Sequence, residues 1–220
     1  MKLTYREEDG ERLGTLLWEF GPGWRMISSA MLGGGIGPRE WVLNAQVVAG
    51  YARMDPAEHL ASLGASLAPG GDGVGMMTAA SVDRCVRAVD GGVEAHATVG
   101  LRVPTWAAAP EGRADQELAP LRAVPAVGTV NILVVAPVAM TDAALVNTVM
   151  TVTEAKSQAL LEAGYAGTGT ASDAVCVAVR ADGPAELFGG PRSEWGARMA
   201  RAVHAAVRQG AEAWHHRHST

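Results

Sequence analysis

Several features that mark specialised classes of protein are missing from this chain of 220 residues. Its 18 lysines and arginines form no cluster and are outnumbered by 23 aspartates and glutamates, so the chain offers little attraction to a nucleic-acid backbone. No apolar run reaches the roughly 18 to 20 residues that a membrane-spanning helix needs. Acidic residues occupy the N-terminus, where a signal peptide would need an apolar segment. We therefore expect no nucleic-acid partner, no membrane insertion and a cytoplasmic location.

Signatures of metal binding and of disulfide formation are equally scarce. The two cysteines, Cys85 and Cys176, show no Cys-x-x-Cys spacing. Cys176 lies in an apolar segment typical of a buried strand, where a thiol behaves as a small hydrophobic side chain. The six histidines form no ligand set, and the histidine-rich C-terminal end is interpreted as a frayed terminus. The sequence therefore indicates no metal site and no cofactor.

Aromatic residues are few, at 5% of the chain, whereas hydrophobic residues make up 48% and charged residues 19%. This composition is typical of a globular protein whose core is built from Ala, Val, Leu and Met. The 27 glycines exceed the usual share of about 7% and indicate many tight turns or close backbone approaches. Neither an internal repeat nor a clear linker is present, so we expect a single domain over residues 1–220.

The first half of the chain predicts mainly strands. Segments 13–20 and 24–30 flank a Gly-Pro-Gly turn and are expected to pair as a hairpin. Alternation of apolar residues over 93–101 indicates a half-buried strand. Asp55 and Pro56 are expected to cap and open a short helix that ends near residue 67. Further strands are expected at 40–48 and 74–79, and loops at 33–37 and 104–126.

The second half predicts alternating strands and helices. The apolar run at 128–137 indicates a strand covered on both faces, and another buried strand follows at 174–179. Thr141 is expected to cap a long helix that ends near Gly164, and Ser193 to cap the last helix. The apolar stripe of that last helix is interpreted as core: Trp195, Met199, Val203, Val207 and Trp214. The sequence thus predicts an α+β fold with a mixed β-sheet core, a strand-rich N-terminal half and a β-α-β-α C-terminal half whose helices pack on the sheet.

Connectivity gathers polar residues at one end of this fold. The helix at 141–163 runs antiparallel to the strand before it, so its second half, Asn131 and the loop at 167–173 must share one end. That loop contains Thr168, Thr170 and Asp173 among glycines. These residue types suit amide hydrolysis, because a hydroxyl or water attacks, a carboxylate accepts its proton and glycine N–H groups hold the oxyanion. The loop is no P-loop, since it follows a helix and lacks lysine. A turn without any functional role is the alternative.

The helix before this loop carries a polar stripe at spacings of four, three and four, formed by Asn147, Thr151, Glu154 and Gln158. The first half of the helix is otherwise apolar almost all round, which predicts burial and therefore protein or ligand partners for the stripe. Lys156 lies about 200° around the helix from Glu154, so we do not expect these two side chains to pair.

A second candidate site is the segment "ISSAMLGGGIG" at 27–37. Its serine pair and the three glycines that follow could present hydrogen-bond donors to a substrate, or could form a simple connector. No Gly-x-Ser-x-Gly elbow and no Ser/His/Asp set is apparent. His59 and His96 are isolated and are interpreted as surface or core histidines.

Seven segments, taken together and in order, are recognisable: "ISSAMLGGG", "VLNAQV", "GVGMMTAA", "GTVNILVV", "ALVNTVMTVTEAKSQAL", "GTGTASDAVCVAV" and "FGGPRSEWGARMARAV". Their most specific part is Thr-Glu-Ala-Lys at 153–156 followed by Gly-Thr-Gly-Thr and Asp173. From about Trp24 to Val207 the chain resembles the adenosylcobinamide amidohydrolase family of cobamide salvage. The resemblance implies hydrolysis of the amide that joins the aminopropanol arm to the corrin ring, giving adenosylcobyric acid. Phe188 is a departure, because an aromatic hydroxyl often stands there in the family.

The candidate residues follow from both lines of reasoning. We hypothesise that Glu154 or Asp173 acts as base toward water or a threonine hydroxyl, while Lys156, Asn131 and loop amides polarise the carbonyl or bind amide groups of the corrin. An N-terminal-nucleophile variant would require self-cleavage before a residue such as Thr129 or Thr170. The catalytic candidates are Glu154, Lys156, Thr168, Thr170 and Asp173. The substrate-binding candidates are Ser28, Ser29, Gly33, Gly34, Gly35, Asn44, Asn131 and Thr151.

Two other classes of function stay open at this point. The first is a corrinoid-binding protein without catalysis, in which the polar stripe only bonds the amides of the ligand. The second is an acyl- or phosphate-transfer enzyme that uses the glycine-rich loops. The many small residues would also permit tight packing of subunits in a homo-oligomer.

Overall fold

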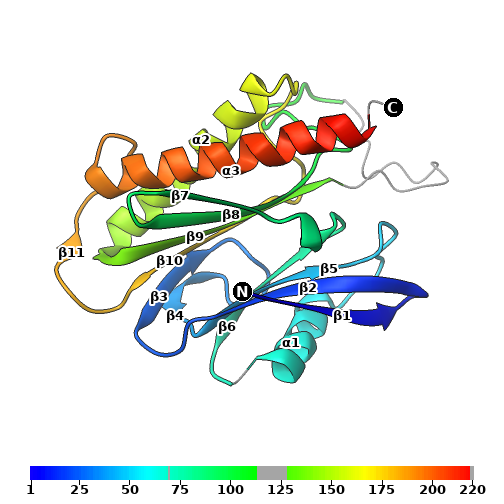
Figure 1. Ribbon diagram of the computed structural model, residues 1–220, viewed down its shortest axis with the longest axis horizontal. Coiled ribbons are helices and arrows are strands. Elements are labelled where there is room, and N and C mark those ends of the chain that lie inside the picture. Colours follow the sequence, from blue (N-terminus) through cyan, green and yellow to red (C-terminus); the bar gives the residue numbers. More distant parts are fainter. Residues whose placement is uncertain (69, 113–127, 219–220) are drawn as a thin grey trace.

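The computed structural model describes residues 1–68, 70–112 and 128–218, and these form four stacked layers (Figure 1). Two helices cover the outer face of one β-sheet, a second sheet packs beneath it, and a short helix covers the far side of that second sheet. The predicted α+β class with helices packed on sheets is confirmed. The single-domain organisation stays a prediction.

The smaller sheet has the strand order β1-β2-β5-β6. Its strands are β1 (Lys2–Glu8), β2 (Glu11–Glu19), β5 (Trp41–Gln46) and β6 (Gly73–Thr78), of which only β5 and β6 run parallel to each other. Helix α1 (Pro56–Leu67) packs on its outer face against Trp41 and Leu43. Asp55 occupies the expected N-cap position but makes no capping bond, because its carboxylate binds Arg53 instead.

The larger sheet has the order β4-β3-β10-β9-β8-β7, with the short strand β11 (Ala185–Glu186) beside the end of β9. A one-turn 3₁₀ helix (Val82–Arg84) precedes β7. Strands β9 and β10 run parallel, and all other pairs along this path are antiparallel. The strands are β3 (Trp24–Ser28), β4 (Gly35–Pro38), β7 (Val86–Asp90), β8 (Val93–Gly100), β9 (Thr129–Met140) and β10 (Ala174–Arg180).

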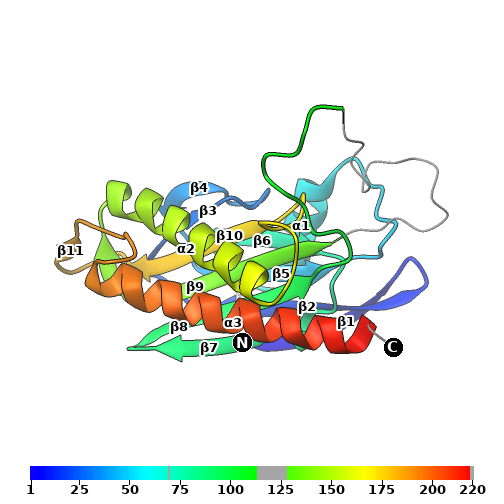
Figure 2. The same cartoon turned by 90° about the horizontal axis from the view of Figure 1, so that it is seen from above.

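Helices α2 (Asp142–Glu162) and α3 (Glu194–His218) lie side by side over the larger sheet (Figure 2). The Thr141 hydroxyl accepts a bond from the Ala144 amide at 3.2 Å, and the Ser193 hydroxyl accepts one from Gly196 at 3.1 Å. Both expected caps are therefore confirmed. The expected core stripe of α3 is confirmed as well, since its three aliphatic members are fully buried and its two tryptophans partly buried.

The expected hairpin between 13–20 and 24–30 is wrong. Strand β2 pairs with β1 and β5 in the smaller sheet, whereas β3 pairs with β4 and β10 in the larger one. The Gly-Pro-Gly turn carries the chain from one layer to the other, and Trp18 and Met26 then meet in the core between the sheets. Burial between two layers outweighs the local preference for a hairpin.

Several other segments also differ from the prediction. Strand β8 is buried on both faces rather than half-buried, because α3 covers one face and residues of the smaller sheet, such as Trp18 and Asn44, contact the other. Residues 35–38 form strand β4 inside the expected loop. Helix α2 is not buried all round, since Val146 and Met150 are more than half exposed on its outer side. Of the expected loop at 104–126, residues 113–126 lie outside the described part of the chain.

Candidate active site

The Asp173 carboxylate is the centre of a hydrogen-bonded cluster at the start of β10. Its Oδ1 accepts bonds from the Val130 amide at 2.9 Å and from the Thr170 hydroxyl at 2.5 Å. Its Oδ2 accepts bonds from the Lys156 ammonium at 2.5 Å and from the Thr170 amide at 3.2 Å. The second half of α2, the loop after it and the first residues of β9 therefore meet here, as connectivity predicted (Figure 2).

The loop that carries Thr170 and Asp173 is positioned from both sides. Gly164 ends α2 in the left-handed conformation, with φ of 86°, which favours glycine. Further along, Thr105 donates its amide to the Gly169 carbonyl at 2.8 Å and accepts the Thr168 amide at 2.9 Å. A Cβ added to Gly169 would overlap Asp173 Oδ2 and lie 2.5 Å from Lys156 Nζ. Glycine is thus required at residue 169 for the cluster to close.

Lys156 and Asp173 form a buried ion pair, with side chains 9% and 10% exposed. Removing two charges from water is costly, and their attraction compensates only when further hydrogen bonds satisfy both groups. The additional donors from Val130 and Thr170 supply such bonds to the carboxylate. The cluster is therefore well satisfied, and the charge of Asp173 is held in a fixed position beside the Thr170 hydroxyl.

The two candidate threonines have different surroundings. The Thr170 hydroxyl donates to Asp173, and its residue is partly exposed to solvent. The Thr168 hydroxyl accepts the Ala107 amide at 3.1 Å and donates to the Thr105 carbonyl at 3.5 Å, so it holds the neighbouring loop in place. Only Thr170 combines a hydroxyl with an adjacent carboxylate, the arrangement of an activated nucleophile.

Asn131 and Asn44 form a buried polar bridge between the two sheets, next to this cluster. Asn131 Nδ2 donates to Asn44 Oδ1 and to the Met77 carbonyl, both at 2.9 Å, and Asn44 Nδ2 donates to the Thr98 hydroxyl at 3.0 Å. Asn131 is in register with Ala174, the residue after Asp173. Within the described part of the chain its buried Oδ1 has no partner. These two amides hold the sheets together behind the loop.

Ser28 and Ser29 lie beside the same end of β10. The buried Ser28 hydroxyl donates to the Val175 carbonyl and accepts the Ala30 amide, both at 3.0 Å, so its hydrogen-bonding capacity is largely used. Ser29 is exposed, and its hydroxyl accepts the Val175 amide at 3.0 Å. Val175 is two residues after Asp173, which places the serine pair next to the cluster. The glycine loop at 33–35 continues from these serines, and Gly33 lines a separate cavity.

Glu154 and Thr151 lie elsewhere, in a groove of about 500 Å³ between α2 and α3. Thr151 donates its hydroxyl to the Gly189 carbonyl at 2.8 Å, and Glu154 is exposed. Lys156 points to Asp173 instead. Within the Thr-Glu-Ala-Lys segment, Glu154 therefore faces the groove and Lys156 faces the loop after α2. Phe188, the departure from the family pattern, is 71% exposed beside Gly189.

Sequence reasoning missed several members of the cluster. The Val130 amide could not be found from residue types, because it reaches Asp173 only through the register of β9 against β10. Ser172 bonds the Thr129 hydroxyl at 2.9 Å, and Ser157 donates to the Thr168 carbonyl at 3.0 Å. Ser157 could have been identified from the sequence, because it adjoins Lys156 and precedes the loop in the same segment.

A search for other kinds of site gives two findings for the described residues. None of their His, Cys, Asp and Glu side chains gather in a group of three or more that could hold a metal ion. None of the helices in the described ranges is both long enough and apolar enough to cross a membrane.

Comparison with known proteins assigns the family. The family model for adenosylcobinamide amidohydrolases matches residues 1–219. A curated protein from Methanosarcina mazei, named adenosylcobinamide amidohydrolase, is 36% identical over 94 residues, which make up 39% of this chain and 47% of that protein. The chain thus spans about half the length of this curated relative. Because the family model covers nearly the whole chain, the resemblance found in the sequence is confirmed, and the chain belongs to the adenosylcobinamide amidohydrolase family.

Proposed function

We propose that this chain hydrolyses the amide bond between the aminopropanol arm and the corrin ring of adenosylcobinamide. Water is consumed, the C–N bond breaks, and the products are adenosylcobyric acid and aminopropanol. Family membership supports the substrate class. The observation that carries the proposal is the Thr170 hydroxyl held 2.5 Å from the Asp173 carboxylate, which is itself fixed by Lys156.

In the proposed first step, Thr170 Oγ1 attacks the carbonyl carbon of the amide and its proton passes to Asp173. A hydroxyl within hydrogen-bonding distance of a base, which a third group orients, is the usual arrangement for covalent catalysis. Lys156 is that third group, because its ammonium bonds Oδ2 while Oδ1 faces the hydroxyl. The proton on Asp173 then passes to the departing amine as the C–N bond breaks, and the acyl group stays on Thr170 as an ester.

In the second step, water attacks the ester and Asp173 accepts the proton that the water loses. The bond between Thr170 Oγ1 and the acyl carbon then breaks, the carboxylic acid is released, and Asp173 returns the proton to Thr170 Oγ1. Negative charge develops on the carbonyl oxygen in both steps, and backbone amides aimed at that oxygen would stabilise it. Ala171 and Ser172 lie in an exposed turn of the same loop, and their amides donate to no other group in the described ranges. We assign the oxyanion contact to these two amides.

Product analysis tests the proposal directly. Purified protein is incubated with adenosylcobinamide, without added nucleotide, and the corrinoid is analysed by mass spectrometry. We expect loss of the aminopropanol unit with the wild type and with Thr170→Ser, and no loss with Thr170→Ala. The intact wild-type protein should keep its mass of 22.8 kDa, because an N-terminal nucleophile released by self-cleavage is not part of this mechanism. Binding of the corrinoid without any change in its mass would instead support a non-catalytic binding protein.

The location and assembly of the protein stay predictions from the sequence. Cell fractionation tests the cytoplasmic location, and the mass of the protein in solution tests the homo-oligomer.

A further inference from the structure

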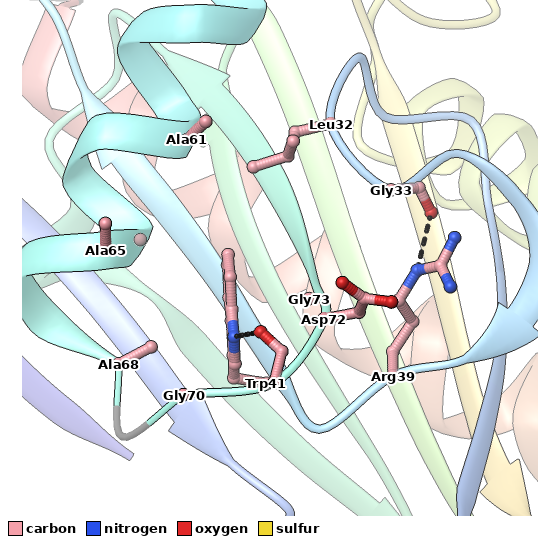
Figure 3. A pocket seen from close by; sticks show the side chains of 12 residues that line it. Leu32, Gly33, Arg39, Trp41, Ala61, Ala65, Ala68, Gly70, Asp72 and Gly73 are labelled. Carbon is pink, nitrogen blue, oxygen red and sulfur yellow. Dashed lines mark hydrogen bonds between the residues drawn. The ribbon is translucent and has the colours of Figure 1, made fainter.

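A cavity of about 450 Å³ lies between α1, the loop after β3 and the start of β6 (Figure 3). Glycine or alanine supplies eight of its twelve lining residues. The volume falls within the range of about 300 to 1,000 Å³ that is typical of small-molecule sites. The cavity is separate from the Asp173 cluster, and none of the steps proposed above uses it.

Trp41 and the glycines packed against it form part of the wall of this cavity. The indole Nε1 donates to the Gly71 carbonyl at 3.0 Å, which fixes the ring (Figure 3). A Cβ added to Gly64 or to Gly73 would overlap the indole ring. A Cβ added to Gly33 would overlap the Gly73 carbonyl oxygen. Around Gly33, Gly64 and Gly73 the wall of the cavity is therefore formed by backbone and by the held indole ring.

Two charged side chains with free hydrogen-bonding capacity stand on one side of this cavity (Figure 3). Arg39 donates Nε to the Gly33 carbonyl at 3.3 Å and Nη1 to the Pro38 carbonyl at 2.7 Å, which leaves Nη2 without a partner in the described ranges. The exposed Asp72 carboxylate bonds no side chain or backbone group there, although its own carbonyl accepts the Glu40 amide at 2.7 Å. Within the described residues, an unpaired carboxylate and a guanidinium held by two backbone carbonyls thus stand beside a cavity lined mainly by small residues.

We propose that this cavity binds the adenosyl group of the corrinoid, an inference that rests on the proposed function. A carboxylate that accepts a hydrogen bond from the ribose 2′-hydroxyl is a recurrent feature of sites that bind adenine dinucleotides. The part of the cavity between α1 and Gly33 is lined mainly by alanine and glycine, so few side-chain atoms would obstruct a flat purine ring there. The free N–H groups of Arg39 then donate to purine ring nitrogens, which are acceptors.

The position of the cavity suits a substrate that also reaches Thr170. Ser29 is bonded to Val175, next to the Asp173 cluster, and Gly33 lines the cavity. The four residues from Ser29 to Gly33 span at most about 14 Å of extended chain. One short loop therefore connects the cavity to the neighbourhood of the Asp173 cluster.

Binding of two corrinoids tests this inference. Dissociation constants for adenosylcobinamide and for cyanocobinamide, which lacks the adenosyl group, are measured by calorimetry. All proteins carry Thr170→Ala, so that the ligand is not hydrolysed during the measurement, and they are compared without a further substitution, with Asp72→Asn and with Ala65→Leu. A leucine side chain at residue 65 would project from α1 into the cavity and fill part of it. Ser62→Leu, on an exposed face of the same helix outside the cavity, and Asp182→Asn, on an exposed turn, are the matched controls.

We expect the Thr170→Ala protein, alone and with either control substitution, to bind adenosylcobinamide at least tenfold more tightly than cyanocobinamide, since a hydrogen bond to a charged group contributes about a factor of ten or more. Adding Asp72→Asn or Ala65→Leu should remove most of that preference while the affinity for cyanocobinamide is unchanged. Absence of the preference in the Thr170→Ala protein, or its survival in both cavity variants, would overturn the inference. The mass of the corrinoid recovered after incubation with the wild type separates this result from the proposed function, because hydrolysis can succeed or fail independently of the preference.

Discussion

Replacement of Lys156 by methionine should destabilise the fold far more than the loss of an ordinary surface ion pair. Both side chains of the Lys156–Asp173 pair are about nine-tenths buried. Removing one partner from a buried pair costs about 3 to 5 kcal/mol, because the other charge stays buried without its counterion. The Asp173 carboxylate keeps its donors from Val130 and Thr170, so we expect the lower end, about 3 kcal/mol.

Urea denaturation followed by circular dichroism measures this loss, and thermal unfolding should show it as a fall in Tm of about 6 to 12 °C for a chain of this size. Lys2→Met is the matched control, because Lys2 and Lys156 are the two lysines of the sequence and Lys2 is exposed. The double variant with Asp173→Asn should be less destabilised than the sum of the two single variants. A loss below about 1 kcal/mol for Lys156→Met, the value of an exposed pair, would refute the reasoning.

Three further predictions concern Gly169, Glu154 and His96. Gly169→Ala should lower turnover strongly and destabilise the protein by about 1 to 3 kcal/mol, because its Cβ would force Lys156 and Asp173 apart; unchanged kinetics would contradict this. Glu154→Gln should keep turnover within a few-fold of the wild type, since Glu154 faces the groove between α2 and α3; a loss as large as that of Asp173→Asn would return Glu154 to the catalytic centre. Burial lowers the pKa of His96 below its usual value, so the unfolded state binds its proton first and stability should fall as pH drops below about 6.5. His96→Gln should flatten the fall between pH 8 and 5.5 in urea denaturation, and an unaltered slope would show that other groups cause it.

The position of the candidate site could be predicted because it depends on local connectivity. A helix that follows a strand through a short turn must return to the end where that strand began. That constraint alone placed Asn131, the second half of α2 and Asp173 together, whatever the order of the strands. Helical periodicity also separated Lys156 from Glu154 correctly. It could not tell which of the two faces the loop, because that depends on how α2 is rotated against β10 and α3.

The arrangement of the two sheets could not be predicted, because strand partners are chosen by packing between layers. The Gly-Pro-Gly turn favoured a hairpin, yet β2 and β3 lie in opposite sheets, where Trp18 and Met26 are buried in one core cluster. Strand β1 was not predicted because four of its seven residues are charged and it lies at the edge of the smaller sheet, without the apolar alternation that marks a buried strand. The cavity beside Trp41 could not be predicted either, because it is lined mainly by glycine and alanine, which carry no chemical signal in a sequence.

The most direct test of the central claim compares turnover of adenosylcobinamide by the wild type and by Asp173→Asn, with aminopropanol release followed by mass spectrometry. Asparagine keeps the shape of the side chain but cannot accept the proton of Thr170, and loss of a general base lowers rates by about 10² to 10⁴. Corrinoid affinity, measured in parallel, should stay close to that of the wild type. The account predicts release by the wild type and a fall of at least a hundredfold in the variant, in line with that range. Full turnover by a folded Asp173→Asn protein would contradict it.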